Sequence, residues 1–227
     1  MNTTATATTK SIPFLRTEMD RLLFLSMLFS CLLTAARILY TGRYTFIFLP
    51  WNLFLAYIPY FISTILSRTS KRGVWWWALS LIWLLFIPNS FYITTDLYHL
   101  ADRYNDRQTP QWFDLAMILS YVWNGLLLGV LSVRQMERIL LPRQTLRSEL
   151  IFLYPVMWLN ALGIYIGRYL RYNSWDVVTD PFQLLRDIAV MVVHPLRHQN
   201  TWDMVLCFSI LMTLIYLMMK KISHALT

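Results

Sequence analysis

The chain has 227 residues, of which 57% are hydrophobic and 14% are charged, and its formal net charge is +8 at pH 7. This composition is too apolar for an ordinary soluble domain, so we expect a membrane protein. The basic balance does not indicate a nucleic-acid partner, because no basic run outside the apolar segments is interleaved with stacking aromatic residues.

Six apolar stretches are long enough for a helix to cross a bilayer, which takes about 20 residues. In chain order they are roughly Leu22–Tyr40, Phe46–Leu66, Val74–Ile93, Gln111–Val133, Glu149–Gly167 and Trp202–Met219. The first stretch lacks a small-residue cleavage site, so we expect it to remain as a membrane anchor. Pro50 and Pro59 interrupt the second. We therefore expect that helix to be kinked and packed inside the bundle, where neighbours can bond to the freed carbonyls.

A seventh apolar segment, Pro181–His194, is too short to cross a bilayer. Asp180 can cap it and Pro181 suits the first helical position, while its polar residues fall on one side. This pattern is typical of a helix lying in the membrane interface. The predicted fold is an all-α, polytopic transmembrane bundle of six helices plus one interfacial amphipathic helix. Residues 21–220 form its single domain, between tails at 1–20 and 221–227.

The distribution of charge predicts the orientation. With six crossings, 12 of the 20 Lys and Arg residues fall on one side: Lys10, Arg16, Arg21, Arg68, Lys71, Arg72, Arg134, Arg138, Arg143, Arg147, Lys220 and Lys221. Only four acids accompany them, so this side carries the entire net charge. The positive-inside rule then places both termini in the cytoplasm.

Polar residues gather at the predicted outer ends of the helices. The expected binding residues of this outward-facing pocket are Arg37, Trp51, Asn52, Asn89, Tyr92, Asn124, Arg168, Arg171, Asn173 and Asp176. Each has a structural alternative, because residues at helix ends also cap helices, form an aromatic belt or pair at the rim. Asn52, Asn124 and Asn160 lie deeper than capping requires, and polar groups at that depth usually face a cavity or one another.

Two G-x-x-x-G motifs, Gly125 with Gly129 and Gly163 with Gly167, permit close helix contact. Their occurrence on successive predicted helices suggests that the fourth and fifth helices touch. That contact would bring Asn124 near Asn160 and Asp114 near Arg168.

Four segments carry a family resemblance: "LPWNLFLAYIP", "IPNSFYITTDLYHL", "WFDLAMILSYVWNGLLLG" and "GRYLRYNSWDVVTDP". In order and spacing they resemble an uncharacterised family of bacterial multi-pass membrane proteins, a domain of unknown function, over roughly residues 20 to 219. The matching residues are Trp51, Asn52, Pro88, Asn89, Tyr92, Thr95, Asp96, His99, Asp114, Asn124, Arg168, Asn173, Trp175 and Asp176. The resemblance implies a bacterial plasma membrane and brings no established activity.

Three functions remain open. The first is binding or transport of a polar or anionic group, such as a lipid headgroup or envelope precursor, with Arg37, Arg168 and Arg171 as charge-assisted donors. The second is a membrane enzyme in which Asp96 and His99 form an acid–base pair or hold a divalent metal, completed by Asp114 or Asp176. The third is an accessory subunit that docks a partner. No cofactor, metal or oligomeric state is indicated by the sequence.

Overall fold

The structure is a computed structural model that describes residues 18–69, 71–105, 109–141, 145–172 and 174–225. The described residues contain helices and no strand, which confirms the all-α class. The elements are α1 Glu18–Thr41, α2 Phe48–Arg68, α3 Val74–Tyr92, η1 Ile93–Asn105, α4 Gln111–Leu140, α5 Leu146–Arg168, α6 Asp176–Thr179, α7 Pro181–Val193, η2 Pro195–His198 and α8 Gln199–Ala225. Most of the predicted tail 1–20 lies outside the described residues.

Six of these helical segments are long and apolar enough to cross a membrane, as the sequence predicted. Their outer faces carry large apolar side chains such as Leu22, Phe29 and Leu214, each more than half exposed. Apolar side chains pointing away from a packed core are expected where a helix meets lipid. The chain is therefore a multi-pass integral membrane protein.

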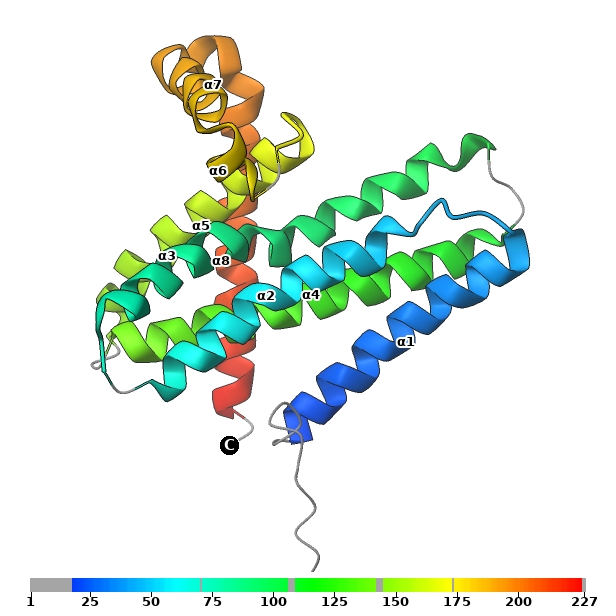
Figure 1. Ribbon diagram of the computed structural model, residues 1–227, viewed down its shortest axis with the longest axis horizontal. Helices are drawn as coiled ribbons and strands as arrows, with labels where there is room; N and C mark the ends of the chain where they lie inside the picture. The colour runs from blue at the N-terminus through cyan, green and yellow to red at the C-terminus, as the bar shows by residue number, and fades with distance from the viewer. Residues whose placement is uncertain (1–17, 70, 106–108, 142–144, 173, 226–227) are drawn as a thin grey trace, which may run out of the picture.

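The helices form two groups joined by α3. In one group α2 packs against α4, and α1 packs mainly on α4; in the other α5 packs against α8. Figure 1 shows α1, α2 and α4 running together while α8 crosses them at a wide angle. The start of α1 and the end of α8 lie at the same lower edge of that view. This placement agrees with an even number of crossings.

Both glycine motifs contact α3, which differs from the expected contact between the fourth and fifth helices. A Cβ atom at Gly125 would lie 2.7 Å from the backbone oxygen of Ser90, and one at Gly163 would lie 2.7 Å from Pro88 Cγ. The small-residue pattern showed correctly that another backbone comes close. It could not show which helix that is, and α3 lies against both motifs.

Two carbonyls beside Pro59 in α2 accept hydrogen bonds from neighbouring helices. Ser90 on α3 donates to the carbonyl of Ala56 at 2.8 Å, and Ser132 on α4 donates to that of Pro59 at 2.9 Å. Ser132 in turn accepts a hydrogen bond from Trp83 Nε1 at 2.8 Å. These contacts hold α3 and α4 against the turn of α2 that contains Pro59. The carbonyl that lacks its helical donor because of Pro59 is that of Leu55, four residues earlier, so bonding of the freed carbonyl by a neighbour stays a prediction.

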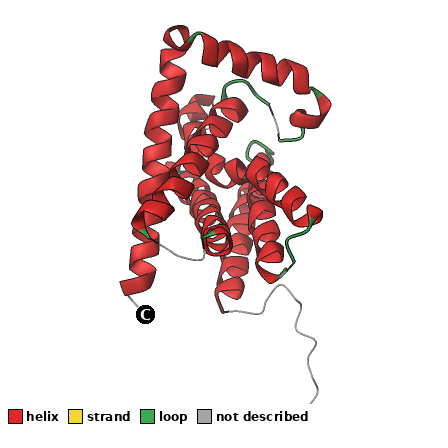
Figure 2. Ribbon diagram, turned by 90° about the vertical axis from the view of Figure 1, so that its left-hand side faces the viewer, coloured by secondary structure: helices red, strands yellow, loops and turns green. Residues whose placement is uncertain are grey.

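The short helix α7 begins where the sequence predicted. The Asp180 side chain accepts a hydrogen bond from the backbone N–H of Gln183, and Pro181 occupies the first turn. Figure 2 shows α7 extending away from one end of α8, across the top of the other helices. Leu184 and Met191 are buried, while Phe182 and Leu185 are exposed. One apolar side of α7 is therefore packed on the protein and another is left uncovered.

Candidate functional site

The centre of the polar layer is a buried carboxylate on η1. Since residues three apart align in a 3₁₀ helix, Asp96 and His99 project from the same side. Asp96 is fully buried, and Asn52 Nδ2 donates to its Oδ2 at 2.9 Å. Arg168 Nη1 lies 3.6 Å from Asp96 Oδ1. At this distance the two groups form an ion pair but no hydrogen bond. Asp96 Oδ1 therefore accepts no hydrogen bond from the described residues.

Arg168 also contacts the imidazole of His99. Both its Nη1 and Nη2 atoms lie 3.2 Å from Nε2 of His99. A guanidinium can only donate, so Nε2 is the acceptor and the ring proton of a neutral His99 sits on Nδ1. Arg168 further donates to the Tyr92 hydroxyl at 3.5 Å. The guanidinium of Arg168 therefore contacts three side chains, Asp96, His99 and Tyr92.

A second ion pair lies between α1 and α4. Arg37 Nε donates to Asp114 Oδ1 at 2.9 Å, and the two side chains are 1% and 0% exposed. Thr109 donates to the same carboxylate at 3.1 Å, and the Arg37 guanidinium lies 4.4 Å from the Phe46 ring centroid. The predicted outer layer thus contains two separate ion pairs, and Asp114 belongs to a different one from Asp96 and His99.

The two deep asparagines on α4 and α5 do not meet. Asn124 donates to Ser30 Oγ at 3.0 Å and to the carbonyl of Ser26, so it connects α4 to α1. Asn160 is also fully buried, and its Nδ2 lies 3.7 Å from Met157 Sδ on its own helix. This separation follows from α3 lying against the glycine motifs of both helices.

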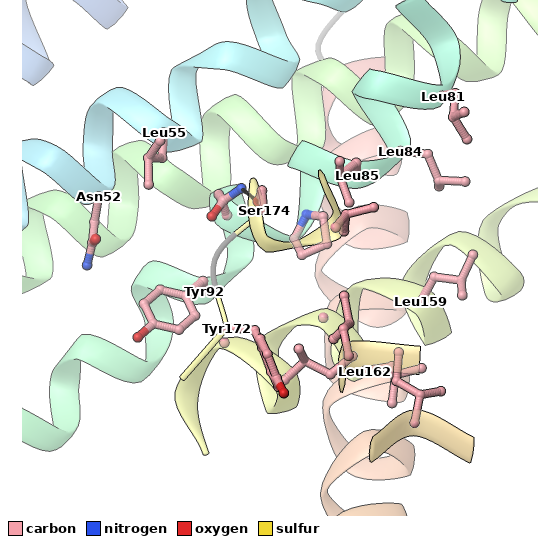
Figure 3. Close-up of a pocket in the computed structure, with 18 of the residues that line it drawn as sticks. Asn52, Leu55, Leu81, Leu84, Leu85, Tyr92, Leu159, Leu162, Tyr172 and Ser174 are labelled. Carbon is pink, nitrogen blue, oxygen red and sulfur yellow. Dashed lines mark hydrogen bonds between the residues drawn. The ribbon is translucent and has the colours of Figure 1, made fainter. Parts of the chain in front are cut away.

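A pocket of about 400 Å³ lies between α2 and α3 on one side and α5 and α7 on the other. Sites for small molecules typically measure about 300–1,000 Å³. Figure 3 shows Asn52, Tyr92, Tyr172 and Ser174, together with Leu55, toward one end and Leu81, Leu84, Leu159 and Leu162 toward the other. Trp51, Pro88, Asn89 and the two glycines Gly163 and Gly167 also line it. The pocket is therefore amphipathic along its length.

The segment after α5 forms the rim near the polar end. Arg171 is exposed and has a positive φ of 61°, an uncommon conformation for a residue with a side chain. Tyr172 donates to Asp187 on α7 at 2.9 Å. Burial, followed by this hydrogen bond, raises the pKa of Tyr172 above its ordinary value. Asp176 opens α6 and accepts from Thr179 Oγ1 at 3.2 Å, while Asn173 lies outside the described residues.

A third cluster lies at the opposite ends of the helices, and its Lys, Arg and Glu residues entered the prediction of orientation only as charges. Glu137 on α4 is 1% exposed and accepts hydrogen bonds from Tyr216 at 2.6 Å and Lys220 at 2.8 Å, both on α8. Arg134 donates to it at 2.7 Å, and Lys220 also pairs with Glu149 on α5 at 2.9 Å. No pattern in the sequence marked this cluster, because Glu137 lies beyond the predicted span Gln111–Val133 and Lys220 lies beyond the span Trp202–Met219.

The pocket and the three ion-pair clusters are the candidate sites of the described chain. Among the residues that the structure describes, no three His, Cys, Asp or Glu side chains come together to hold a metal ion. Asp96 Oδ1 is the buried carboxylate oxygen of this site that accepts no hydrogen bond from the described residues. The Glu137 and Arg37 clusters connect helices through charged groups, of which Glu137, Arg37 and Asp114 are at most 1% exposed.

Comparison with known proteins identifies the family and no activity. No curated protein and no solved structure matches the chain. The model of a protein family of unknown function, DUF1361, matches residues 51–215, which contain α3, α4, α5 and the whole pocket. The chain is therefore a member of the DUF1361 family, an integral membrane protein whose molecular function the family does not define.

Proposed function

We propose that the protein binds the polar headgroup of a lipid or lipid-linked envelope molecule in the pocket between α2, α3, α5 and α7. The observation that carries this proposal is the segregation of polar and apolar side chains along that pocket. A lipid has the same division, with a polar head attached to a hydrocarbon chain. The binding residues are Trp51, Asn52, Asn89 and Tyr92, which line the pocket, with Arg168 directly behind Tyr92.

We further propose that the polar end of the pocket faces the outside of a bacterial plasma membrane. The excess of Lys and Arg at the opposite helix ends supports this orientation, because such residues are retained on the cytoplasmic side. A lipid of the outer leaflet would then reach the pocket laterally, with its head at the level of Asn52 and its chain beside the leucines.

Lipid retention tests this function. The purified protein is expected to carry a bound lipid in native mass spectrometry. The variant Leu159→Trp should lose it, because Leu159 lines the pocket and a larger ring there fills the chain end. Leu211→Trp on α8 is the matched control, since the two leucines are 45% and 48% exposed and Leu211 does not line the pocket. Equal lipid loss in both variants, or in neither, contradicts the proposal.

A membrane enzyme is the second candidate, and one observation favours it. Asp96 Oδ1 is buried and accepts no hydrogen bond from the described residues, although the ion pair with Arg168 keeps it next to a positive charge. A buried oxygen without a donor is costly, and catalytic groups often show this feature. Asp96→Asn would then trap unconverted substrate. Native mass spectrometry of both proteins after incubation in membranes measures the mass of the bound lipid. The same mass on Asp96→Asn and on the wild type would mean that no conversion depends on Asp96, which argues for binding alone.

A further inference from the structure

The polar end of the pocket has a defined hydrogen-bonding capacity. The Asn52 amide nitrogen donates to Asp96, and that of Asn89 donates to the carbonyl of Phe86 at 3.0 Å and to Ser174 Oγ at 2.9 Å. A carboxylate and a backbone carbonyl can only accept hydrogen bonds. The Asp96 carboxylate therefore fixes the orientation of the Asn52 amide, and the Phe86 carbonyl fixes that of Asn89. The carbonyl oxygens of Asn52 and Asn89 accept no hydrogen bond from the described residues, so they remain available as acceptors.

Two hydroxyl groups supply donors beside these acceptors. Tyr92 accepts from Arg168, and Ser174 accepts from Asn89, so the described residues leave the proton of each hydroxyl unused. A ligand that satisfies all four groups must both donate and accept hydrogen bonds. Hydroxyl groups do both, whereas a phosphate of full charge only accepts and an ammonium only donates.

The charge of the lining leads to the same class of ligand. None of the described residues that line the pocket is charged. Arg168, the cation nearest to Tyr92, is already held by Asp96 and His99. Arg171 lies on the exposed rim and outside the lining. An ionic headgroup that enters the pocket would therefore lose part of its hydration without a charged lining residue to pair with, which is unfavourable. Two amide oxygens facing a phosphate would add repulsion.

The apolar end admits a hydrocarbon chain but provides little selectivity. A lipid tail in the bilayer is already in surroundings as apolar as leucine, so moving it beside Leu84 and Leu162 changes its free energy little. Discrimination must come from the polar end. Resting on the proposed lipid-binding function, we infer that the pocket selects an uncharged, hydroxyl-bearing lipid over a phosphate-bearing lipid with the same chains.

A competition experiment tests this inference. The full chain is reconstituted in phosphatidylcholine nanodiscs that contain equal amounts of dioleoylglycerol, glucosyl-dioleoylglycerol and dioleoyl phosphatidic acid. After release, bound lipid is measured by native mass spectrometry. Either neutral lipid should be retained about tenfold more than phosphatidic acid, and the comparison of the two shows whether one hydroxyl or a sugar fills the polar end. Tyr92→Phe and Ser174→Ala should each lower that retention about three- to tenfold, the factor for one hydrogen bond.

Controls separate this inference from the function on which it rests. Tyr154→Phe removes the same hydroxyl from an exposed tyrosine of α5 that does not line the pocket, and it should change nothing. Preferential retention of phosphatidic acid that Leu159→Trp abolishes would overturn the neutral class and leave the proposed function standing. Retention of no lipid, or retention that Leu159→Trp leaves unchanged, would overturn both.

Discussion

Replacing Asp114 by alanine should loosen α1 from the bundle, because Arg37 would remain charged and buried without its carboxylate. Arg37 on α1 and Asp114 on α4 form an ion pair, and their side chains are 1% and 0% exposed. Removing one partner of such a pair costs about 3–5 kcal/mol. Whole domains are typically stable by only about 5–15 kcal/mol, so the variant should lose a large part of its stability.

The double variant Arg37→Met with Asp114→Leu separates the charge from the packing. Buried ion pairs are often replaced by apolar residues of similar size with little loss, so this protein should be more stable than Asp114→Ala alone. The assay is the free energy of unfolding in mixed detergent micelles, with Arg43→Met as an exposed control near the same helix end. If Asp114→Ala lost less than about 1 kcal/mol, or if the double variant were equally unstable, the reasoning from buried charge would be refuted.

Three further substitutions test the packing, the opposite end and the orientation. Gly125→Ala should lower the thermal midpoint, since overpacking costs about 1–3 kcal/mol and the new Cβ would lie 2.7 Å from a backbone oxygen. Gly73→Ala meets nothing within 4 Å and should lower it less, by the cost of alanine at the N-cap of α3 alone. Lys220→Met should destabilise the protein by about 1.5–3 kcal/mol, because it loses the bonds of Lys220 to Glu137 and Glu149. Lys221→Met changes the exposed neighbouring position and should leave the stability unchanged. Equal effects of the two substitutions would contradict a specific role of Lys220. In a chain without its own cysteines, Val177→Cys should react with an impermeant external thiol reagent and Lys71→Cys should not, and the reverse pattern would invert the proposed orientation.

The apolar stretches were sufficient to predict six membrane helices, because a backbone in lipid must bond to itself and a helix of about 20 residues does so. Local chemistry also predicted the start of α7, where Asp180 and Pro181 act within one turn. The third predicted span ended at Ile93, and the structure shows that η1 continues it to Asn105. The sequence could not predict this extension, because polar residues of η1 such as Asp96 are buried by partners on other helices.

Only the tertiary structure decided which polar residues meet. The sequence placed Arg37, Asp96, Asp114 and Arg168 in one layer, but every arginine in that layer can attract every aspartate, and pairing depends on which helices are neighbours. The structure pairs Arg37 with Asp114 and Arg168 with Asp96. The pocket has the same origin, because its polar and apolar ends are assembled from α2, α3, α5 and α7, and no single helix carries the division. Apolar length along one segment is a local property, whereas a contact between segments depends on the packing of the whole bundle.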